Sequence, residues 1–382
     1  YFFDSLLIHR GFNGSILVAK DGAIVYEKYV GYGDLRKKDA LTDSTALHIA
    51  STGKTLTAMA VLRLVQENKL SLDDSIQQFF PSFPYEGVTV KMLMSHRSGL
   101  PNYLYFLEAD KNYKNQYVTN NDVLEYLITK KPNRSFKPGT RFSYSNTNFV
   151  MLALIIEKIS GQSFAAFMKE KIFGPLQMND TYVYSLADSA TAIHSFNYNN
   201  TLWQNDRMEG TAGDKNIYST PKDLLKWDQA LYTDQFLRKT LLDSAFTPYS
   251  LERPSVHNYG LGWRMLLLPN GKKVIYHFGR WHGFNAAFAR LTDEKVTIII
   301  LGNKFNRNIY STANKAYDIF GNYDRSRNSG NDEDDDDNEK TKLQKVMLSK
   351  FGSADLAQKD PKKAETIETS LATKPAEARK AF

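Results

Sequence analysis

The segment Leu47-His48-Ile49-Ala50-Ser51-Thr52-Gly53-Lys54 runs directly into a helical pattern that is expected to span residues 52–68. Apolar side chains recur there at helical spacing, at Leu56, Ala60, Val61, Leu64 and Val65. Ser51 and Lys54 are three residues apart, so at the start of a helix their hydroxyl and amine lie on one face, one turn apart. The positive end of the helix also favours negative charge that develops on Ser51.

The pair Ser51 and Lys54 has two interpretations. An amine whose pKa is lowered by burial or by nearby positive charge can take the serine proton, which makes Ser51 a nucleophile without a histidine. Alternatively, Ser51 is a helix N-cap and Lys54 a surface residue, because serine and lysine occur at this spacing by chance in many proteins. This pattern alone leaves both interpretations open.

Strand patterns lie at both ends of the chain. Residues 15–19 and 23–28 are apolar and β-branched, and Lys20-Asp21-Gly22 between them predicts a hairpin, because Asp-Gly accepts positive φ. Further strands are expected downstream, as an antiparallel meander over residues 263–268, 272–277, 284–291 and 296–301. We therefore expect an α/β fold of the α+β type, with an antiparallel sheet built from N- and C-terminal strands and flanked by helices.

The middle of the chain is mainly helical in pattern. Residues 70–80 contain a turn and stop at Pro81, residues 148–159 read as a buried helix that ends at Gly161, and Thr220-Pro221 begins another helix. The expected division has an α/β body at 1–85 and 206–325 and an inserted helical subdomain at 86–205. Residues 326–382 are expected to be a linker and charged tail. Its acidic run, 332–337, is interpreted as a solvated spacer, with cation binding as the less favoured alternative.

Composition excludes several classes of protein. The chain has no cysteine, which excludes disulfides, thiolate nucleophiles and cysteine-ligated metals. No apolar run approaches the ~20 residues of a transmembrane helix; the longest are 150–156 and 296–301. The net charge is +7 and the basic residues are scattered, which argues against a nucleic-acid partner and leaves weak binding to anionic envelope polymers open. Because the chain begins at Tyr1, a removed leader or tag is expected.

Two further elements carry polar groups suited to chemistry. Tyr144 and Asn146 precede the expected buried helix; a phenol near two cations ionises more readily and can carry protons, while the asparagine amide can hold a substrate carbonyl. His277-Phe278-Gly279 is expected at the end of an edge-type strand. Glycine there allows another backbone to approach closely, and the adjacent N–H groups can receive an oxyanion.

In this order and spacing, Ser51-x-x-Lys54, Tyr144-x-Asn146 and His277-x-Gly279 resemble the three active-site motifs of the serine β-lactamase and penicillin-binding protein superfamily, in its class C-like branch. The resemblance covers about residues 12–320. Four flanking phrases strengthen it: Leu93-Met94-Ser95-His96-Arg97-Ser98-Gly99-Leu100-Pro101, Pro138-Gly139, the stretch 210–223, and Tyr259-Gly260-Leu261-Gly262-Trp263.

The resemblance implies an acyl-enzyme hydrolase that needs no metal or organic cofactor. Ser51 would attack a carbonyl, Lys54 and Tyr144 would share the proton transfers, and Asn146 would position the substrate. The backbone N–H groups of Ser51 and Arg280 would form the oxyanion hole, and water would release the acyl group. None of the seven histidines forms an H-E-x-x-H pattern, in agreement with a metal-free site. Export to the periplasm or cell surface is also implied.

One motif departs from the family. True β-lactamases have Lys-Thr-Gly in the third motif and bind the drug's carboxylate with the lysine and threonine, whereas this chain has His277 and Phe278. The departure favours esters or peptides over antibiotics. His277 would supply either a positive charge or a hydrogen bond from a neutral ring, and the sequence does not decide between them.

Other residues near the motifs are assigned less specifically. His96 and Ser98 are expected in a structural turn, and His282 is left unassigned. Five aromatic residues are equally compatible with cleft walls and with the core: Tyr103, Tyr105, Phe106, Trp281 and Phe284.

Three functions are compatible with these residues. The favoured one is a serine hydrolase of a small ester, amide or D-amino acid peptide. The second is a penicillin-binding DD-carboxypeptidase or weak class C-like β-lactamase, whose partners would include peptidoglycan fragments or β-lactams. The third is a catalytically idle member that binds cell-wall fragments or another partner.

Overall fold

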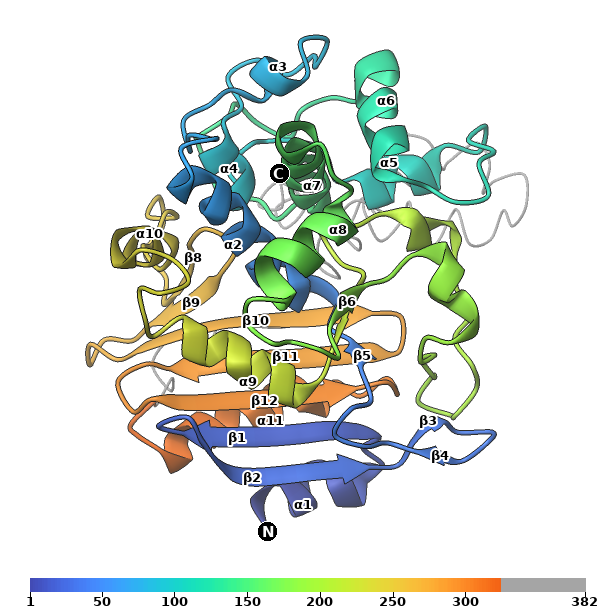
Figure 1. The fold of residues 1–382 in the computed structure, drawn as a ribbon, viewed down its shortest axis with the longest axis vertical. Coiled ribbons are helices and arrows are strands. Elements are labelled where there is room, and N and C mark those ends of the chain that lie inside the picture. The colour runs from blue at the N-terminus through green and yellow to red at the C-terminus, as the bar shows by residue number, and fades with distance from the viewer. Residues whose placement is uncertain (324–382) are drawn as a thin grey trace, which may run out of the picture. The chain divides into compact units, whose positions relative to one another are not determined.

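A seven-stranded antiparallel sheet organises the chain, and its strand order joins the two ends of the sequence (Figure 1). The computed structural model describes residues 1–323. The strand order is β2-β1-β12-β11-β10-β9-β8. The bounds are β1 (Gly14–Lys20), β2 (Ala23–Val30), β8 (His257–Tyr259), β9 (Arg264–Leu267), β10 (Lys273–Trp281), β11 (Phe284–Leu291) and β12 (Val296–Gly302).

The hairpin and the meander confirm the strands expected from the sequence. The β1–β2 turn places Asp21 at φ 51° and Gly22 at φ 78°, the positive values that an Asp-Gly turn accepts. β1 then pairs with β12 from Gly14↔Gly302 to Lys20↔Val296. The N-terminal hairpin is thereby joined to the last strand of the meander, so that one open sheet combines strands from the first 30 residues with strands from residues 257–302.

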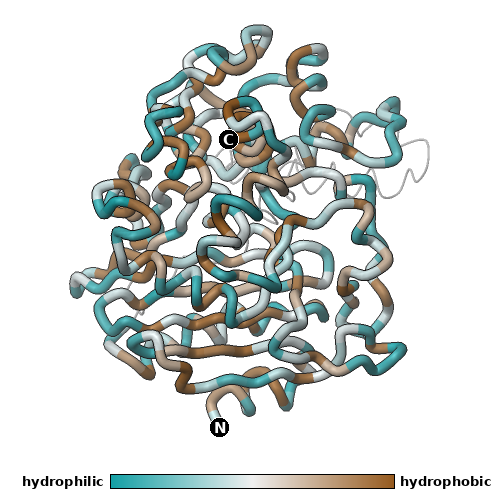
Figure 2. Tube along the Cα trace, in the orientation of Figure 1, coloured by the Kyte–Doolittle hydropathy of each residue, from teal (hydrophilic) through white to brown (hydrophobic). Residues whose placement is uncertain are grey.

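Helices cover both faces of this sheet. Residues that alternate along a strand point to opposite faces, so Ile16 and Val18 of β1 pack in one apolar cluster while Leu17 and Ala19 pack in another. The first cluster includes residues of α1 (Phe2–Leu6) and α11 (Asn308–Ala316), and the second includes residues of the other helices. Figure 2 shows hydrophobic residues along the central strands, as a sheet buried on both faces requires.

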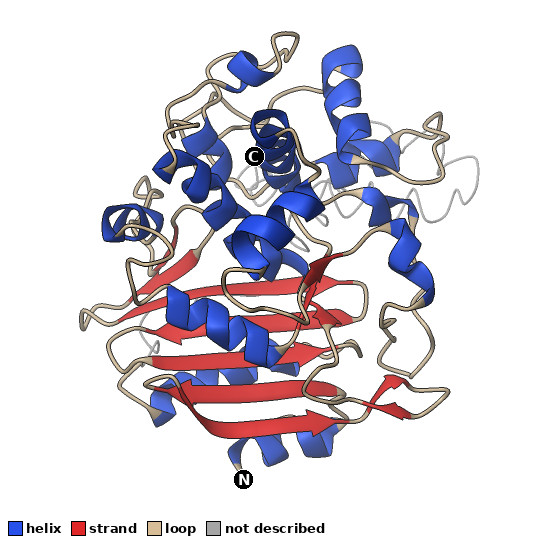
Figure 3. Cartoon of the chain, in the orientation of Figure 1, coloured by secondary structure: helices blue, strands red, loops and turns tan. Residues whose placement is uncertain are grey.

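Most of the described helices lie between the first two strands and the meander in the sequence. Figure 3 shows helices in blue and strands in red. The helices of this region are α2 (Gly53–Gln66), α3 (Ile76–Phe79), α4 (Val90–Met94), α5 (Tyr103–Ala109), α6 (Asn120–Lys130), α7 (Asn146–Ser160), α8 (Phe164–Met168), α9 (Pro221–Ala230) and α10 (Lys239–Ala245). Shorter helical turns are η1 (Ile8–Arg10), η2 (Ala50–Thr52), η3 (Lys169–Phe173), η4 (Leu186–Ala190), η5 (Arg207–Gly210) and η6 (Tyr317–Ile319). The small sheets contain β3 (Tyr32–Asp34) with β4 (Asp39–Ala40), and β5 (Leu47–His48) with β7 (Ile217–Ser219) and β6 (Tyr182–Val183).

The helix boundaries follow the local sequence. α7 ends at Gly161, whose φ of 70° allows its N–H to bond the carbonyl of Glu157. Thr220 caps α9 through its side chain, and Pro221 occupies the first helical position, where the missing N–H costs nothing. Both helices therefore begin or end where the sequence predicts.

One strand differs from its expected place. β10, which carries His277-Phe278-Gly279, is an interior strand between β9 and β11, so the expectation of an edge-type strand is wrong for the strand as a whole. β9 pairs with it only over Lys273–Tyr276, however, and the third motif lies beyond that pairing.

The division into a body and a helical subdomain stays a prediction, and the expected tail lies outside the described residues.

Within residues 1–323, each helix taken alone is too short or too polar to cross a bilayer. One bent pair, Asn146–Ser160 with Phe164–Phe173, meets the length and composition criteria jointly, at an angle of 79°.

A buried ion pair attaches α9 to the sheet and yields a prediction. Asp228 of α9 accepts hydrogen bonds from Arg290 Nε and Thr297 Oγ1, both at 2.5 Å, and all three side chains are buried. Removing one partner leaves a buried charge uncompensated, so Asp228→Ala is expected to lower the free energy of unfolding by about 3–5 kcal/mol.

Urea unfolding measures this change, and Asp243→Ala is the matched control. Asp243 pairs with Lys239 at 2.7 Å on the surface, where such a pair contributes about 1 kcal/mol or less. Equal losses in the two variants would contradict the proposed contribution of the buried pair.

Candidate active site

Ser51 lies in the short turn η2, directly before α2. The residue before it, Ala50, has a φ of 48°, in the left-handed region that non-glycine residues rarely adopt. The buried ring of His48 accepts the N–H of Ala50 at Nδ1, at 3.0 Å. Asn216 holds the other ring nitrogen of His48 at 3.0 Å. The strained backbone before Ser51 is thus fixed by a side chain that the sequence reasoning did not single out.

Lys54 is fully buried, so it is not the surface lysine of the alternative interpretation. Its Nζ donates to Ser51 Oγ at 2.9 Å, to Asn146 Oδ1 at 2.7 Å and to the backbone carbonyl of Asp214 at 2.7 Å. These acceptors come from η2, α7 and the segment before β7, and together they match the three donors of an ammonium group. The structure therefore brings three of the predicted site residues into one hydrogen-bonded group.

Tyr144 is buried beside this group, with positive charges on two sides of its ring. Lys54 Nζ lies 5.0 Å from the ring centroid, and the guanidinium carbon of Arg264 lies 5.2 Å from it. Arg264 belongs to β9 and was missed by the sequence reasoning. Two cationic side chains therefore lie near the Tyr144 ring, as the sequence argument assumed.

His96 supports the backbone that carries Tyr144. Its Nδ1 accepts the N–H of Ser145 at 3.2 Å and lies 3.0 Å from Asn148 Nδ2, while Ser98 Oγ donates to Asn148 Oδ1 at 2.6 Å. The His96 ring also packs 4.2 Å from that of Tyr144. Burial, together with the charges of Lys54 and Arg264, holds the pKa of His96 well below its usual value. His96 and Ser98 thus act in a structural turn.

His277 is buried beneath the site. Burial and the charges of Arg264 and Lys54 hold its pKa well below the usual value, so its ring is neutral. Its Nδ1 lies 2.6 Å from the carbonyl oxygen of Phe278 and is therefore the protonated nitrogen, and Nε2 accepts from the hydroxyl of Tyr259 at 3.1 Å. Phe278 stacks on Tyr310 of α11, on the opposite face of the sheet.

Gly279 allows the nucleophile turn to touch β10. A Cβ at this position would lie 2.6 Å from the carbonyl oxygen of Ile49, 2.8 Å from the nitrogen of Ser51 and 2.9 Å from that of Thr52. All three are backbone atoms, so no side-chain movement could relieve the clash. The close backbone approach expected at this glycine is thus present.

The N–H of Arg280 is directed out of the β10–β11 ladder. Trp281 and Phe284 pair across a two-residue turn, so they form a hydrogen-bonded pair. Because such pairs alternate along an antiparallel ladder, Arg280 opposite Asn285 belongs to a non-hydrogen-bonded pair. Its N–H therefore points to the side from which β9 has already departed, next to the turn that contains Ser51.

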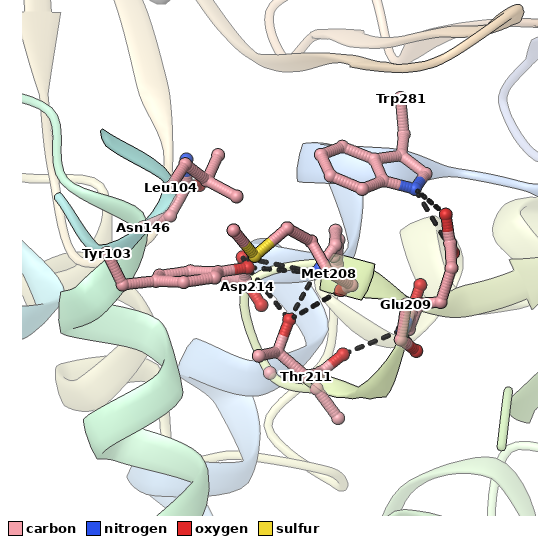
Figure 4. Close-up of polar contacts among 12 residues, drawn as sticks. Tyr103, Leu104, Asn146, Met208, Glu209, Thr211, Asp214 and Trp281 are labelled. Carbon is pink, nitrogen blue, oxygen red and sulfur yellow. Dashed lines mark hydrogen bonds and ion pairs between the residues drawn. The ribbon is translucent and has the colours of Figure 1, made fainter. Parts of the chain in front are cut away.

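A buried polar cluster supports the segment that holds Lys54 (Figure 4). The Tyr103 hydroxyl donates to Asp214 Oδ2 at 2.8 Å, and Lys215 Nζ donates to the same hydroxyl at 2.8 Å. Thr211 bonds both Tyr103, at 2.8 Å, and Lys215. These contacts fix the backbone of Asp214, whose carbonyl accepts from Lys54. Three of its residues, Thr211, Asp214 and Lys215, lie within the stretch 210–223, to which the sequence reasoning assigned no individual roles.

The aromatic residues near the motifs are mostly core residues. Tyr103 and Phe284 are buried, and the ring of Phe106 stacks on Tyr126 at 4.9 Å. Trp281 is partly exposed, and Lys215 Nζ lies 4.7 Å from its ring centroid. Figure 4 shows the Trp281 indole directed to Glu209, with which its ring nitrogen forms hydrogen bonds. Trp281 and Tyr105 are thus both partly exposed and are compatible with a cleft wall.

The family model named Beta-lactamase matches residues 4–320. The chain belongs to the beta-lactamase family. It is 34% identical over 327 residues to penicillin-binding protein 4* of Bacillus subtilis, a match that covers 81% of this chain and 72% of that protein. It is 27% identical over 310 residues to the protein flp of Staphylococcus aureus; this match covers 76% of the chain but 59% of flp.

The fold is likewise that of the beta-lactamase family. The crystal structure of D-amino acid amidase from Ochrobactrum anthropi, complexed with L-phenylalanine, superposes with a TM-score of 0.69 at 20% identity. The superposition covers 83% of this chain and 96% of the amidase. The mixed fold with an antiparallel sheet, expected from the sequence, is confirmed.

Three buried neutral histidines predict that stability falls in weak acid. Burial lowers the pKa of His48 to about 4, and the pKa values of His96 and His277 are also lowered by burial. In the unfolded chain a histidine titrates near 6.5. Between about pH 4 and 6.5 the unfolded chain therefore binds more protons, and each such histidine lowers the free energy of unfolding by up to about 1.4 kcal/mol per pH unit as the pH falls.

Urea unfolding at pH 7.5, 6.5, 5.5 and 4.5 measures this dependence. The variant His48→Asn is expected to show a shallower slope between pH 6.5 and 4.5, because one of the three groups is removed. A free energy of unfolding that stays constant from pH 7.5 to 4.5 would show that these histidines do not fold as buried neutral rings.

Proposed function

We propose that the chain is a serine hydrolase that forms a covalent acyl-enzyme on Ser51. The observation that carries the proposal is the buried amine of Lys54, 2.9 Å from Ser51 Oγ at the start of α2. Its two other hydrogen bonds aim the amine at the hydroxyl. The chain belongs to the beta-lactamase family, which supports the same assignment.

In the proposed acylation, the Ser51 oxygen bonds to the substrate carbonyl carbon while its proton passes to the Lys54–Tyr144 pair. The carbonyl oxygen becomes an oxyanion, which the backbone N–H groups of Ser51 and Arg280 receive. The proton then passes from Tyr144 to the leaving group as its bond to the carbonyl carbon breaks. Water next attacks the carbonyl carbon of the Ser51 ester and gives one proton to the Lys54–Tyr144 pair. The bond from that carbon to the Ser51 oxygen then breaks, the acid is released, and the pair passes the water proton to the serine oxygen. No step needs a cofactor.

Asn146 is proposed to hold the substrate. Its Oδ1 accepts from Lys54, which orients the amide so that the Nδ2 hydrogens are its donors toward a substrate carbonyl. The same contact links substrate positioning to the proton-transfer group, since a shift of Asn146 would also move an acceptor of Lys54.

The substrate is proposed to be a small ester, an amide or a D-amino acid peptide. His277 is neutral and buried, and Phe278 packs on the opposite face, so neither side chain offers the carboxylate contact that Lys-Thr-Gly gives in β-lactamases. The fold is similar to that of a D-amino acid amidase, and this analogy between folds supports amides of that kind as substrates. A cell-wall substrate would place the protein in the periplasm or at the cell surface.

A penicillin-binding DD-carboxypeptidase or weak β-lactamase is the second candidate function. The 34% identity to penicillin-binding protein 4* favours it. The idle binding protein is less well supported, because Ser51, Lys54, Tyr144 and Asn146 are all present and Lys54 contacts both Ser51 and Asn146.

A fluorophosphonate probe tests the nucleophile. Intact mass spectrometry is expected to show one adduct on the native chain and none on Ser51→Ala, because only an activated serine reacts at a useful rate. Ser44→Ala, at an exposed serine, is the matched control and is expected to keep the adduct. An adduct on Ser51→Ala, or none on the native chain, would refute the proposed nucleophile.

A substrate panel separates the two enzymatic functions. Short-chain p-nitrophenyl esters and D-alanyl peptides are expected to be turned over with a kcat/KM at least about tenfold above that for benzylpenicillin, equivalent to about 1.4 kcal/mol in transition-state binding. Steady-state kinetics measures the turnover, and mass spectrometry detects penicilloyl adducts. A stable adduct on Ser51 at micromolar benzylpenicillin would instead favour the penicillin-binding function.

A further inference from the structure

Three potential metal ligands converge next to the candidate active site. Asp206 and Glu209 lie at the start and within η5, and His282 lies in the turn between β10 and β11. One carboxylate oxygen of each acid and one ring nitrogen of His282 all lie within 4.8 Å of one another. His282 Nε2 is 2.7 Å from Glu209 Oε1 and 3.9 Å from Asp206 Oδ2. The fold thus brings His282 to two acids that lie more than seventy residues before it in the sequence.

Each of these side chains is held by a group outside the set. The His282 ring lies between two indoles, with ring centroids 5.7 Å from Trp203 and 4.5 Å from Trp281. Trp281 Nε1 also donates to Glu209 Oε1 at 3.1 Å (Figure 4). Asp206 Oδ1 accepts a backbone N–H of η5 at 2.7 Å, so Oδ2 is the oxygen turned toward His282. Such supporting contacts orient ligands before an ion binds.

The donor set and its spacing suit a divalent transition-metal ion. Bonds of about 2.0–2.2 Å to one ion separate neighbouring ligand atoms by roughly 3–3.5 Å. The distances of 2.7 and 3.9 Å from His282 Nε2 to the two carboxylates lie on either side of that range. An imidazole nitrogen favours ions such as Zn²⁺ over Mg²⁺ and Ca²⁺, and two carboxylates balance a charge of +2.

We propose that Asp206, Glu209 and His282 form a binding site for one divalent transition-metal ion such as Zn²⁺. Water or a substrate oxygen would complete the coordination, as three protein ligands leave positions open. The site lies at the C-terminal end of β10, where Trp281 is two residues after Gly279 and His282 follows directly. It does not depend on the proposed hydrolase chemistry, since none of its ligands takes part in the proton transfers.

No local motif in the sequence indicates this site. The family resemblance implied that no metal is required, and the absence of an H-E-x-x-H pattern agreed with it. Glu209 and His282, however, meet only through the pairing of β10 with β11 and the position of η5. Asp206 and Glu209 are three residues apart in a stretch with no metal-binding signature.

Titration with Co²⁺, a spectroscopic substitute for Zn²⁺, tests the proposal on the full chain after treatment with EDTA. Excess Ca²⁺ is included to occupy weak oxygen sites such as the acidic run 332–337. We expect one Co²⁺ per chain at micromolar concentration, visible d–d absorption, and parallel quenching of tryptophan fluorescence, because Trp203 and Trp281 flank His282. Calorimetry with Zn²⁺ gives the affinity of the same site.

Variants assign the ligands. Glu209→Gln and His282→Gln are expected to lower the affinity for Co²⁺ and Zn²⁺ at least about tenfold, equivalent to about 1.4 kcal/mol. His9→Gln, at an exposed histidine, is the matched control and is expected to bind like the native chain. Asp206→Asn changes an exposed residue and keeps an oxygen for the η5 cap, so it tests the site even where a buried variant fails to fold.

Two results would overturn the proposal. One is the absence of saturable Co²⁺ and Zn²⁺ binding in the native chain, which would leave Glu209 and His282 as an ordinary hydrogen-bonded pair. The other is binding by His282→Gln with native affinity and native tryptophan quenching, which would place the ion elsewhere. Binding measured in Ser51→Ala is expected to equal that of the native chain, so the metal site and the nucleophile are tested separately.

Discussion

The hydrogen bonds of Lys54 are the interaction on which the candidate site depends. A buried ammonium or amine is costly unless its donors find acceptors, and here the acceptors come from η2, α7 and the backbone at Asp214. Each acceptor is useful only if its own segment is fixed. His48 fixes the strained turn before Ser51, and Tyr103 with Lys215 fixes the segment of Asp214. Several buried polar side chains from distant segments therefore help to place one amine.

Strand β10 of the antiparallel sheet lies against the turn that contains Ser51. β10 can touch the nucleophile turn only because Gly279 has no Cβ and because β9 stops pairing after Tyr276. The first condition is written in the sequence as one residue type. The second is a property of register, which follows from the lengths of the strands and the turns between them. Both conditions must hold for the backbone N–H groups of Ser51 and Arg280 to lie on the same side of the cleft.

The sequence was informative where signals are local. Asp21-Gly22, Gly161 and Thr220-Pro221 mark the ends of elements through backbone geometry, and the structure places those ends as predicted. The ordered motifs likewise predicted that Ser51, Lys54 and Asn146 belong to one site, and these side chains are hydrogen-bonded in the structure. Their catalytic roles stay predictions. Long-range contacts left no such signal: the cation beside Tyr144 from Arg264 depends on strand pairing. The protonation state of His277 depends on how deeply the ring is buried, and the residue type alone does not reveal this.

The neutral state of His277 has a consequence for specificity. Along β10, the His277 side chain is buried, Phe278 packs against α11 and Gly279 has no side chain, so the third motif offers mainly backbone groups to the proposed substrate site. Backbone N–H groups stabilise any oxyanion and distinguish acyl groups poorly. Discrimination must then come from side chains around the cleft, among which Trp281 is partly exposed and held by Glu209. Selectivity is thus expected to respond to changes at Trp281 and its neighbours more than to changes at His277, whose removal would act chiefly through the packing of Tyr144 and Tyr259.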